Sequence, residues 1–146
     1  MKVLLVEDDP SKEDRLTQAI LEVHPSASLQ IARSVQQAVV NVDKGPFDLI
    51  VLDIALPSHQ SQVGGAQPLQ QPSGGVEVLL ELSFGQRSDR VVIVTQYPDI
   101  EFGGKFYPLS KFPRMASNDL SINLKAVVKY HPSGESWKTT FKREIA

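Results

Sequence analysis

The sequence has no cysteine, no excess of positive charge and no long hydrophobic run. Without cysteine there are no disulfides and no thiol chemistry. A net charge of -2 leaves no general basic field for a nucleic-acid backbone, so we do not expect nucleic-acid binding. The opening "MKVLLVEDD" has an apolar run too short for a signal peptide or a membrane span, and acids follow it. We therefore expect a cytoplasmic protein without membrane attachment.

Histidine is also scarce, and its three copies are scattered rather than paired at a metal-binding spacing. A transition-metal site is therefore not expected. The length of 146 residues suits one domain with a full hydrophobic core.

Short apolar runs alternate with amphipathic segments along most of the chain. The runs "KVLLV", "SLQIA", "DLIVLD", "RVVIVT" and "KAVVKY" each have the length and composition of a strand. Helical spacing of apolar residues separates them, and Asp9 followed by Pro10 is a typical helix start. This alternation predicts a single α/β domain over residues 1–146, with a parallel sheet covered by helices on both faces.

Two segments depart from this alternation. Residues 58–74 are rich in Gly, Pro and Gln and predict a long loop insertion. Residues 96–124 contain several prolines and paired glycines without a sustained helical stripe. We expect an irregular segment there in place of a helix.

Polar side chains follow three of the predicted strands. Glu7 and Asp8 come after the first strand, Asp53 ends the third and Thr95 ends the fourth. In open parallel sheets, ligand sites form outside the carboxyl ends of the strands. We therefore expect these residues to converge on one edge.

The chemistry of this group points to a hard cation and a phosphoryl group. Clustered carboxylates raise one another's pKa unless a cation shares them, and Mg2+ prefers such oxygen ligands. A carboxylate beside Mg2+ can act as a nucleophile toward phosphorus. The transferred group then needs a hydroxyl donor and a cation around it. Thr95 can supply the hydroxyl, and a lysine can supply the cation.

The motifs "VLLVEDDP", "DLIVLDIALP", "GVEVLLEL" and "VVIVT", in this order, resemble the receiver domains of two-component response regulators, the CheY-like family. The resemblance covers residues 1–57 and 75–95. It implies a flavodoxin-like sandwich with strand order 2-1-3-4-5. It also implies that Asp53 is the phosphoacceptor, that Glu7, Asp8, Asp53 and the backbone carbonyl of Ala55 bind Mg2+, and that Thr95 is the switch hydroxyl.

The later part of the chain departs from the family. Gln96 replaces the usual small residue and is a candidate modulator of access to the phosphoryl pocket. The family's lysine at the end of the fifth strand corresponds best to Lys129, with Lys111 as the rival. Ala126 stands where an aromatic switch residue is usual. Tyr130, next to Lys129, is either a substitute for that residue or, as is more common for a tyrosine at a strand end, a packing residue.

The resemblance implies a signalling domain that assists its own phosphotransfer and dephosphorylation, rather than an enzyme with a separate substrate. Its partners would be a histidine kinase or phosphotransfer protein and a downstream protein effector, and homodimerisation is a further option. No effector domain follows Ala146, so we expect a stand-alone receiver that signals by protein contacts.

Two other functions are weighed against this one. A pseudo-receiver would use the same fold as an interaction module without phosphorylation, as the unusual residues 96–124 suggest. An aspartyl-phosphate hydrolase would need a second acid two residues after its nucleophile, but that position is Ala55. The hydrolase is therefore disfavoured.

Overall fold

A computed structural model describes residues 1–59, 70–71 and 73–146 of the chain. Its elements, in order, are β1 (Lys2–Val6), α1 (Pro10–Val23), β2 (Ser28–Ala32), α2 (Val35–Asp43), β3 (Leu49–Leu52), β4 (Leu56–Pro57), β5 (Gln70–Gln71), α3 (Gly74–Phe84), β6 (Arg90–Thr95), β7 (Asp99–Phe102), β8 (Lys105–Pro108), α4 (Phe112–Leu120), β9 (Asn123–Lys129) and α5 (Ser136–Ile145). No helix among these described residues is long and apolar enough to cross a membrane. The cytoplasmic location stays a prediction.

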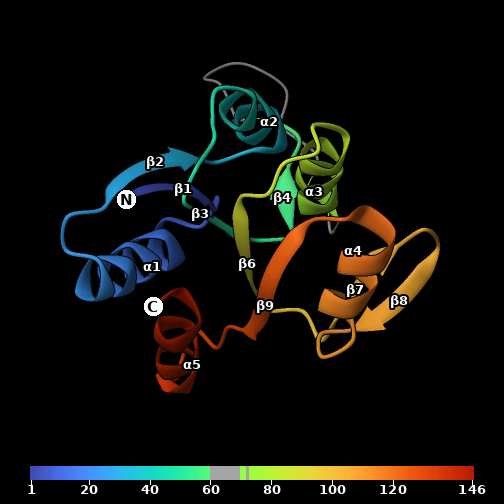
Figure 1. Ribbon diagram of the computed structural model, residues 1–146. Coiled ribbons are helices and arrows are strands. Elements are labelled where there is room, and N and C mark those ends of the chain that lie inside the picture. The colour runs from blue at the N-terminus through green and yellow to red at the C-terminus, as the bar shows by residue number, and fades with distance from the viewer. Residues whose placement is uncertain (60–69, 72) are drawn as a thin grey trace, which may run out of the picture.

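The centre of the molecule is a five-stranded parallel sheet of order β2-β1-β3-β6-β9 (Figure 1). Counting only the strands of this sheet, the order is 2-1-3-4-5, as predicted. Helices α1 and α5 cover one face, and α2, α3 and α4 cover the other (Figure 1). The single-domain flavodoxin-like fold is therefore confirmed.

The central strands are buried on both faces, which explains their continuous apolar runs. All four residues of β3 are buried, and β6 is buried over Val91–Thr95. Successive side chains alternate between two cores. Leu52 and Ile93 belong to the core beneath α2, α3 and α4, whereas Val51 and Val94 belong to the core beneath α1 and α5.

Helix α1 begins where the sequence predicts. The Asp9 side chain accepts hydrogen bonds from the backbone N–H groups of Ser11 at 2.9 Å and Lys12 at 3.5 Å, and Pro10 occupies the first turn. Such a cap satisfies amide groups that have no partner within the helix. The start of α1 is thereby fixed next to the end of β1, where the candidate site lies.

Residues 96–124 are more regular than the sequence indicates, and the expectation of an irregular segment is wrong. An antiparallel hairpin, β7–β8, is followed by the nine-residue helix α4. Pro113 is compatible with this helix because it lies in the first turn, where a proline costs no hydrogen bond. Phe112 and Ala116 are fully buried on the inward face of α4.

The predicted loop at residues 58–74 falls largely on residues 60–69 and 72, which lie outside the described part of the chain. At its two ends, β4 and β5 form a short antiparallel pair, with Leu56 opposite Gln71 and Pro57 opposite Gln70. Helix α3 begins at Gly74, at the end of the predicted loop.

The last strand of the sheet contains a bulge. Val91 of β6 pairs with Leu124, but the next residue, Val92, pairs with Ala126, so Lys125 is an extra residue in β9. A bulge of one residue reverses which face each later side chain points to. Val128 and Tyr130 therefore face α1 and α5. Lys129, between them, points toward the opposite face.

Candidate phosphoacceptor site

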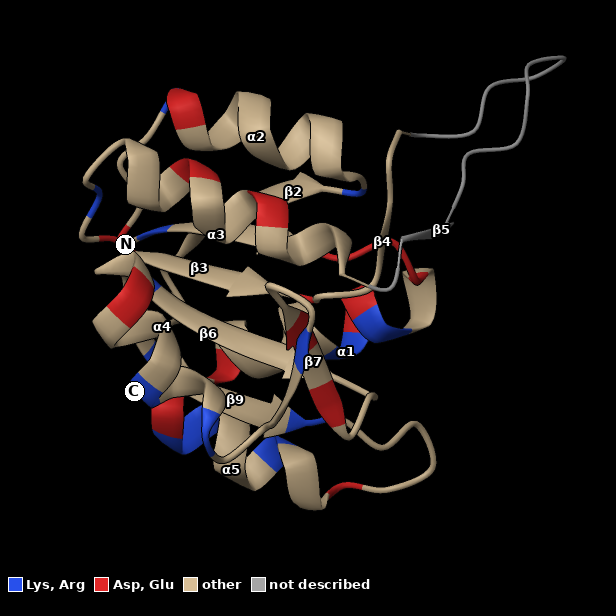
Figure 2. Cartoon of the chain, turned by 90° about the vertical axis from the view of Figure 1, so that its right-hand side faces the viewer, with Lys and Arg blue, Asp and Glu red and all other residues tan. Residues whose placement is uncertain are grey.

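The carboxyl ends of the sheet strands form one edge, where the arrowheads of β3, β6 and β9 point the same way (Figure 2). A pocket of about 380 Å³ lies at this edge. Its lining residues are Glu7, Asp8, Asp9, Asp53, Ala55, Gln96 and Tyr97. The predicted acids and Gln96 are therefore brought together.

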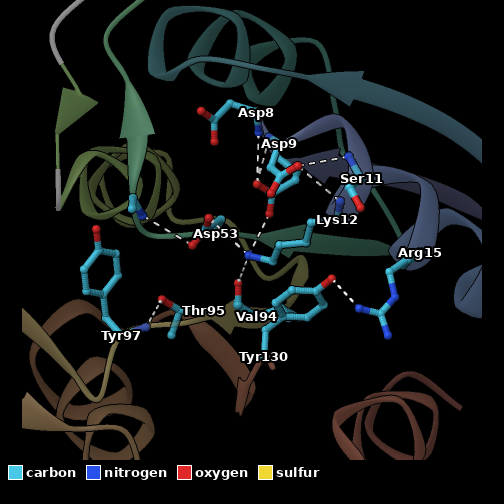
Figure 3. Close-up of polar contacts among 12 residues, drawn as sticks. Asp8, Asp9, Ser11, Lys12, Arg15, Asp53, Val94, Thr95, Tyr97 and Tyr130 are labelled. Carbon is cyan, nitrogen blue, oxygen red and sulfur yellow. Dashed lines mark hydrogen bonds and ion pairs between the residues drawn. The ribbon is translucent and has the colours of Figure 1, made fainter. Parts of the chain in front are cut away.

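Asp53 lies immediately after β3 and is only 9% exposed. Its backbone N–H donates to the carbonyl of Val6 at 3.0 Å, which ties it to the end of β1. Its Oδ1 accepts a hydrogen bond from the N–H of Ala55 at 3.3 Å, and its Oδ2 lies 3.1 Å from Nζ of Lys12 (Figure 3). The side chain is thus oriented at the wall of the pocket.

Glu7 and Asp8 occupy different environments. Glu7 is 1% exposed, and its Oε2 accepts hydrogen bonds from the N–H groups of Asp8 at 3.1 Å and Asp9 at 3.2 Å. Its other oxygen, Oε1, contacts Nζ of Lys12 at 2.7 Å. Asp8 is only half-buried and its carboxylate points away from Lys12 in Figure 3. Asp8 is therefore the more accessible of the two.

Both residues have raised pKa values. Burial, and then the charge of Asp53, raise the pKa of Glu7 to about 7, although Lys12 opposes the change. Burial and the charge of Asp53 also raise the pKa of Asp8 above its ordinary value. The site therefore carries more negative charge than its surroundings easily stabilise, a condition that an added cation relieves.

The sequence analysis did not identify Lys12 as part of the site. Its side chain is 1% exposed, and its ammonium group contacts three acceptors, namely Glu7, Asp53 and the carbonyl of Val94 at 2.8 Å (Figure 3). Burial disfavours the charged form of Lys12, but Asp53 and Glu7 outweigh it and raise the pKa of the amine. A signal was present in the sequence, because Lys12 stands four residues before Leu16 on the apolar stripe of α1.

Thr95 ends β6 next to the pocket, but the pocket is lined there by the two residues that follow it, Gln96 and Tyr97. Thr95 is completely buried, and its hydroxyl accepts a hydrogen bond from the N–H of Tyr97 at 3.2 Å (Figure 3). Gln96 is exposed at the pocket wall, and the Tyr97 side chain is 46% exposed. Gln96 and Tyr97 therefore stand where they can affect entry.

The two lysines proposed from sequence do not reach the acids. Lys129 pairs in register with Thr95 at the end of β9, but its amine forms no hydrogen bond or ion pair with any described residue. Lys111 is exposed at the start of α4 and likewise has no side-chain partner in the described ranges. In this state, Lys12 is the lysine in contact with Asp53.

Tyr130 connects this lysine to the last loop of the chain. Its backbone N–H donates to the carbonyl of Thr95 at 2.8 Å, and its ring centroid lies 5.2 Å from Nζ of Lys12. Arg15 donates to its hydroxyl at 2.9 Å and also to the carbonyls of Pro132 and Gly134. Tyr130 is thus a packed support beneath the site.

The donor set fits a magnesium ion. Glu7, Asp8 and Asp53 each offer a carboxylate oxygen, and these three atoms lie within 4.8 Å of one another. Magnesium binds through one or two carboxylates while keeping several waters. The partly exposed Asp8 and Asp53 match this requirement, with Ala55 lining the same pocket. The three carboxylates outnumber the one ammonium group among them.

The fold and the acidic edge are those expected of a receiver-like α/β domain, and comparison with known proteins agrees. No family model matches the chain. The chain is 30% identical over 139 residues to the Detocs response regulatory protein DtcB of Vibrio alginolyticus, covering 93% of each chain. The chain therefore belongs to the response regulators with a CheY-like receiver domain.

Solved structures support the same fold. The phosphorylated cyanobacterial phytochrome response regulator RcpA matches with a TM-score of 0.66 and 18% identity, over 97% of this chain and 89% of that chain. The response regulator TrrA of Thermotoga maritima, solved in complex with Mg2+ and BeF, matches with a TM-score of 0.59 and 18% identity, over 98% and 97% of the two chains. At these identities the structures establish the fold alone.

Proposed function

We propose that Asp53 accepts a phosphoryl group from a histidine kinase or a phosphotransfer protein, and that the phosphorylated domain signals through protein contacts. The observation that carries this proposal is the position of the Asp53 carboxylate. It lies at the wall of an open pocket, close to two further acids and beside a buried ammonium group. Membership of the response regulators supports the same role.

The transfer would run through an oxygen of Asp53. This oxygen attacks the phosphorus of a phosphohistidine and forms a new P–O bond while the P–N bond breaks. The electron pair of that bond returns to the imidazole of the donor, which takes up a proton from water. The product is an aspartyl phosphate, and attack by water on its phosphorus would later restore the carboxylate and release inorganic phosphate.

Asp8 and Asp53 would hold Mg2+, with the carbonyl of Ala55 as a further ligand. The more deeply buried Glu7 would orient the site through its contacts with Lys12 and the Asp8 N–H. When bound, the ion would supply positive charge that balances the negative charge of the transferred group. The donor set described above supports this assignment.

The signal would start at Thr95. A phosphoryl group on Asp53 would attract the Thr95 hydroxyl, which accepts from Tyr97 in this state. Loss of that contact would free the segment after β6 and shift the equilibrium of the surface around β9 and α5. A downstream protein, or a second copy of the chain, would recognise that surface.

Intact mass spectrometry tests the proposal. Wild type and Asp53→Asn are incubated with acetyl phosphate, with and without Mg2+. We expect one added phosphoryl group on the wild type in Mg2+ and none on the variant. An equal gain on both proteins, or no gain with a second phosphodonor, would contradict the proposal.

A second candidate function is a pseudo-receiver, which binds partners without being phosphorylated. One observation favours it, because Lys12 already places a cation between Glu7 and Asp53. Binding of Mg2+ separates the two functions. A phosphoacceptor site should bind Mg2+ saturably, and this binding should depend on Asp8 and Asp53. A pocket whose acids are already balanced by Lys12 alone does not require Mg2+ binding.

A further inference from the structure

The phosphorylation proposed for Asp53 does not yet assign a role to the buried amine of Lys12. A lysine in the first turns of an amphipathic helix usually extends into water, because burying its charge is costly. Here the side chain is 1% exposed; its ammonium group donates a hydrogen bond to the carbonyl of Val94 and forms ion pairs with Glu7 and Asp53. These three contacts hold the charge beside Asp53.

The packing around Lys12 fixes this place further. The ring of Tyr130 lies beneath the ammonium group, and Arg15 binds the Tyr130 hydroxyl from one turn further along α1. Trp137 packs against the same ring, with centroids 4.9 Å apart. The amine is therefore held by residues at the ends of β1, β3, β6 and β9 together.

The bulge in β9 explains why the charge comes from α1. Because Lys125 is an extra residue, position 130 rather than 129 faces the α1 side of the sheet, and it is a tyrosine. The amine of Lys129 has no partner among the described residues. The last strand therefore supplies no lysine to Asp53 on the α1 side of the sheet. Lys12 of α1 is the lysine that contacts Asp53 there.

We propose that Lys12 is the residue that binds the phosphoryl group on Asp53, in the role that the sequence assigned to Lys129 or Lys111. This inference rests on the proposed function of Asp53. The amine lies 3.1 Å from Oδ2 of Asp53, so a phosphoryl oxygen attached to that carboxylate would lie close to the amine. An ammonium group there balances charge that develops during transfer.

The test compares Lys12→Met with Lys129→Met and Lys111→Met in the full chain. Lys12→Met removes the charge and keeps an unbranched side chain that is one heavy atom shorter. Two quantities are measured in saturating Mg2+: the rate of phosphorylation by acetyl phosphate, and the dissociation constant for beryllofluoride by calorimetry. For Lys12→Met we expect the rate to fall and the dissociation constant to rise, each by about 100-fold. For the other two variants both quantities should stay within about twofold of the wild-type values.

Binding of Mg2+ alone separates a direct role from a structural one. Loss of the Lys12 charge removes a competing cation, so a folded Lys12→Met protein should bind Mg2+ as tightly as the wild type or more tightly. Weaker Mg2+ binding in parallel with weaker beryllofluoride binding would mean that Lys12 only maintains the site, and would overturn the proposal.

Glu7 is left without its cation in Lys12→Met, which could prevent folding. The pair Glu7→Gln and Glu7→Gln/Lys12→Met covers that case, because neither protein leaves a buried charge at position 7. The double variant should bind beryllofluoride much more weakly than Glu7→Gln. Equal binding by the two would refute the role of Lys12.

The wild type separates failure of this proposal from failure of the proposed function. If wild type itself is not phosphorylated, the function proposed for Asp53 fails and the role of Lys12 fails with it. If wild type is phosphorylated and Lys12→Met is phosphorylated at the same rate, the role of Lys12 alone fails.

Discussion

Asp89 is a buried carboxylate outside the candidate site, and three hydrogen bonds hold it. Arg87 binds it in a two-pronged contact of 2.8 Å for each bond, and the N–H of Phe47 donates at 2.7 Å. Burial by itself would raise the pKa of Asp89, but these donors outweigh it and lower the pKa below the ordinary 3.8. The lowered pKa means that the charged form stabilises the fold.

Asp89→Asn should therefore lower the free energy of unfolding at pH 7 by about 2 kcal/mol. A lowered pKa contributes stability above the ordinary value, and this contribution is lost as the pH falls through the folded-state pKa. The difference between wild type and variant should accordingly shrink below about pH 4. Urea unfolding at several pH values measures it, with the exposed Glu101→Gln as control. A difference that stays constant with pH would contradict this explanation.

At the same scale, the acids of the site could be predicted from the order of the strands, whereas Lys12 left only one signal in the sequence, its place on the apolar stripe of α1. Glu7, Asp8 and Asp53 follow strands that are visible as apolar runs, so their convergence follows from parallel topology. Lys129 was chosen because it ends the last strand. Its direction depends on one extra residue in β9, and the sequence does not mark the position of a bulge.

Helix α3 approaches the site closely, and Gly75 makes this approach possible. The N–H of Gly75 donates to the carbonyl of Ile54 at 2.7 Å. A methyl group added at Gly75 would come within 2.7 Å of Cα of Ile54 and would also collide with the backbone carbonyl of Asp53. These neighbours are backbone atoms, which cannot rotate away as a side chain can.

Gly75→Ala should therefore displace the turn after β3. We expect a loss of about 1–3 kcal/mol in the free energy of unfolding, together with slower phosphorylation of Asp53. Gly134→Ala is a matched control, because its added methyl group would lie 3.7 Å from Cβ of His131, an ordinary contact. Chemical denaturation and the acetyl phosphate assay measure the two effects. If Gly75→Ala and Gly134→Ala had the same free energy of unfolding and the same phosphorylation rate, the close packing of α3 on the turn after β3 would not position the site.

Among the elements, the five strands of the main sheet were predictable and helix α4 was not. Strands buried on both faces leave a continuous apolar run, which is a strong signal. Helix α4 is short, and it contains Pro113. A proline inside a helix usually breaks it, so the sequence predicts a helix here only if Pro113 is known to lie in the first turn. The hairpin β7–β8 before it relies on Gly103 and Gly104, both with positive φ, and such a pair also suits a plain loop.

For the whole molecule, the acidic edge predicts that Mg2+ stabilises the fold. An ion that binds the folded state alone raises the free energy of unfolding by about 1.4 kcal/mol at ten times its dissociation constant. For a domain of this size, this corresponds to a rise of roughly 3–6 °C in Tm. The rise should disappear in Asp8→Asn. Thermal unfolding with Mg2+ or with matched Na+ measures it, and an equal rise in the variant would place the ion elsewhere.

The central claim is that the carboxylate of Asp53 becomes phosphorylated, and chemical mapping tests it most directly. The protein is treated with acetyl phosphate and Mg2+, reduced with borohydride, which converts an aspartyl phosphate to homoserine, and digested for peptide mass spectrometry. We predict homoserine at position 53 and aspartate at every other aspartate position. Homoserine at another position, or aspartate at position 53 in a protein that has gained the phosphoryl mass, would contradict the assignment of Asp53.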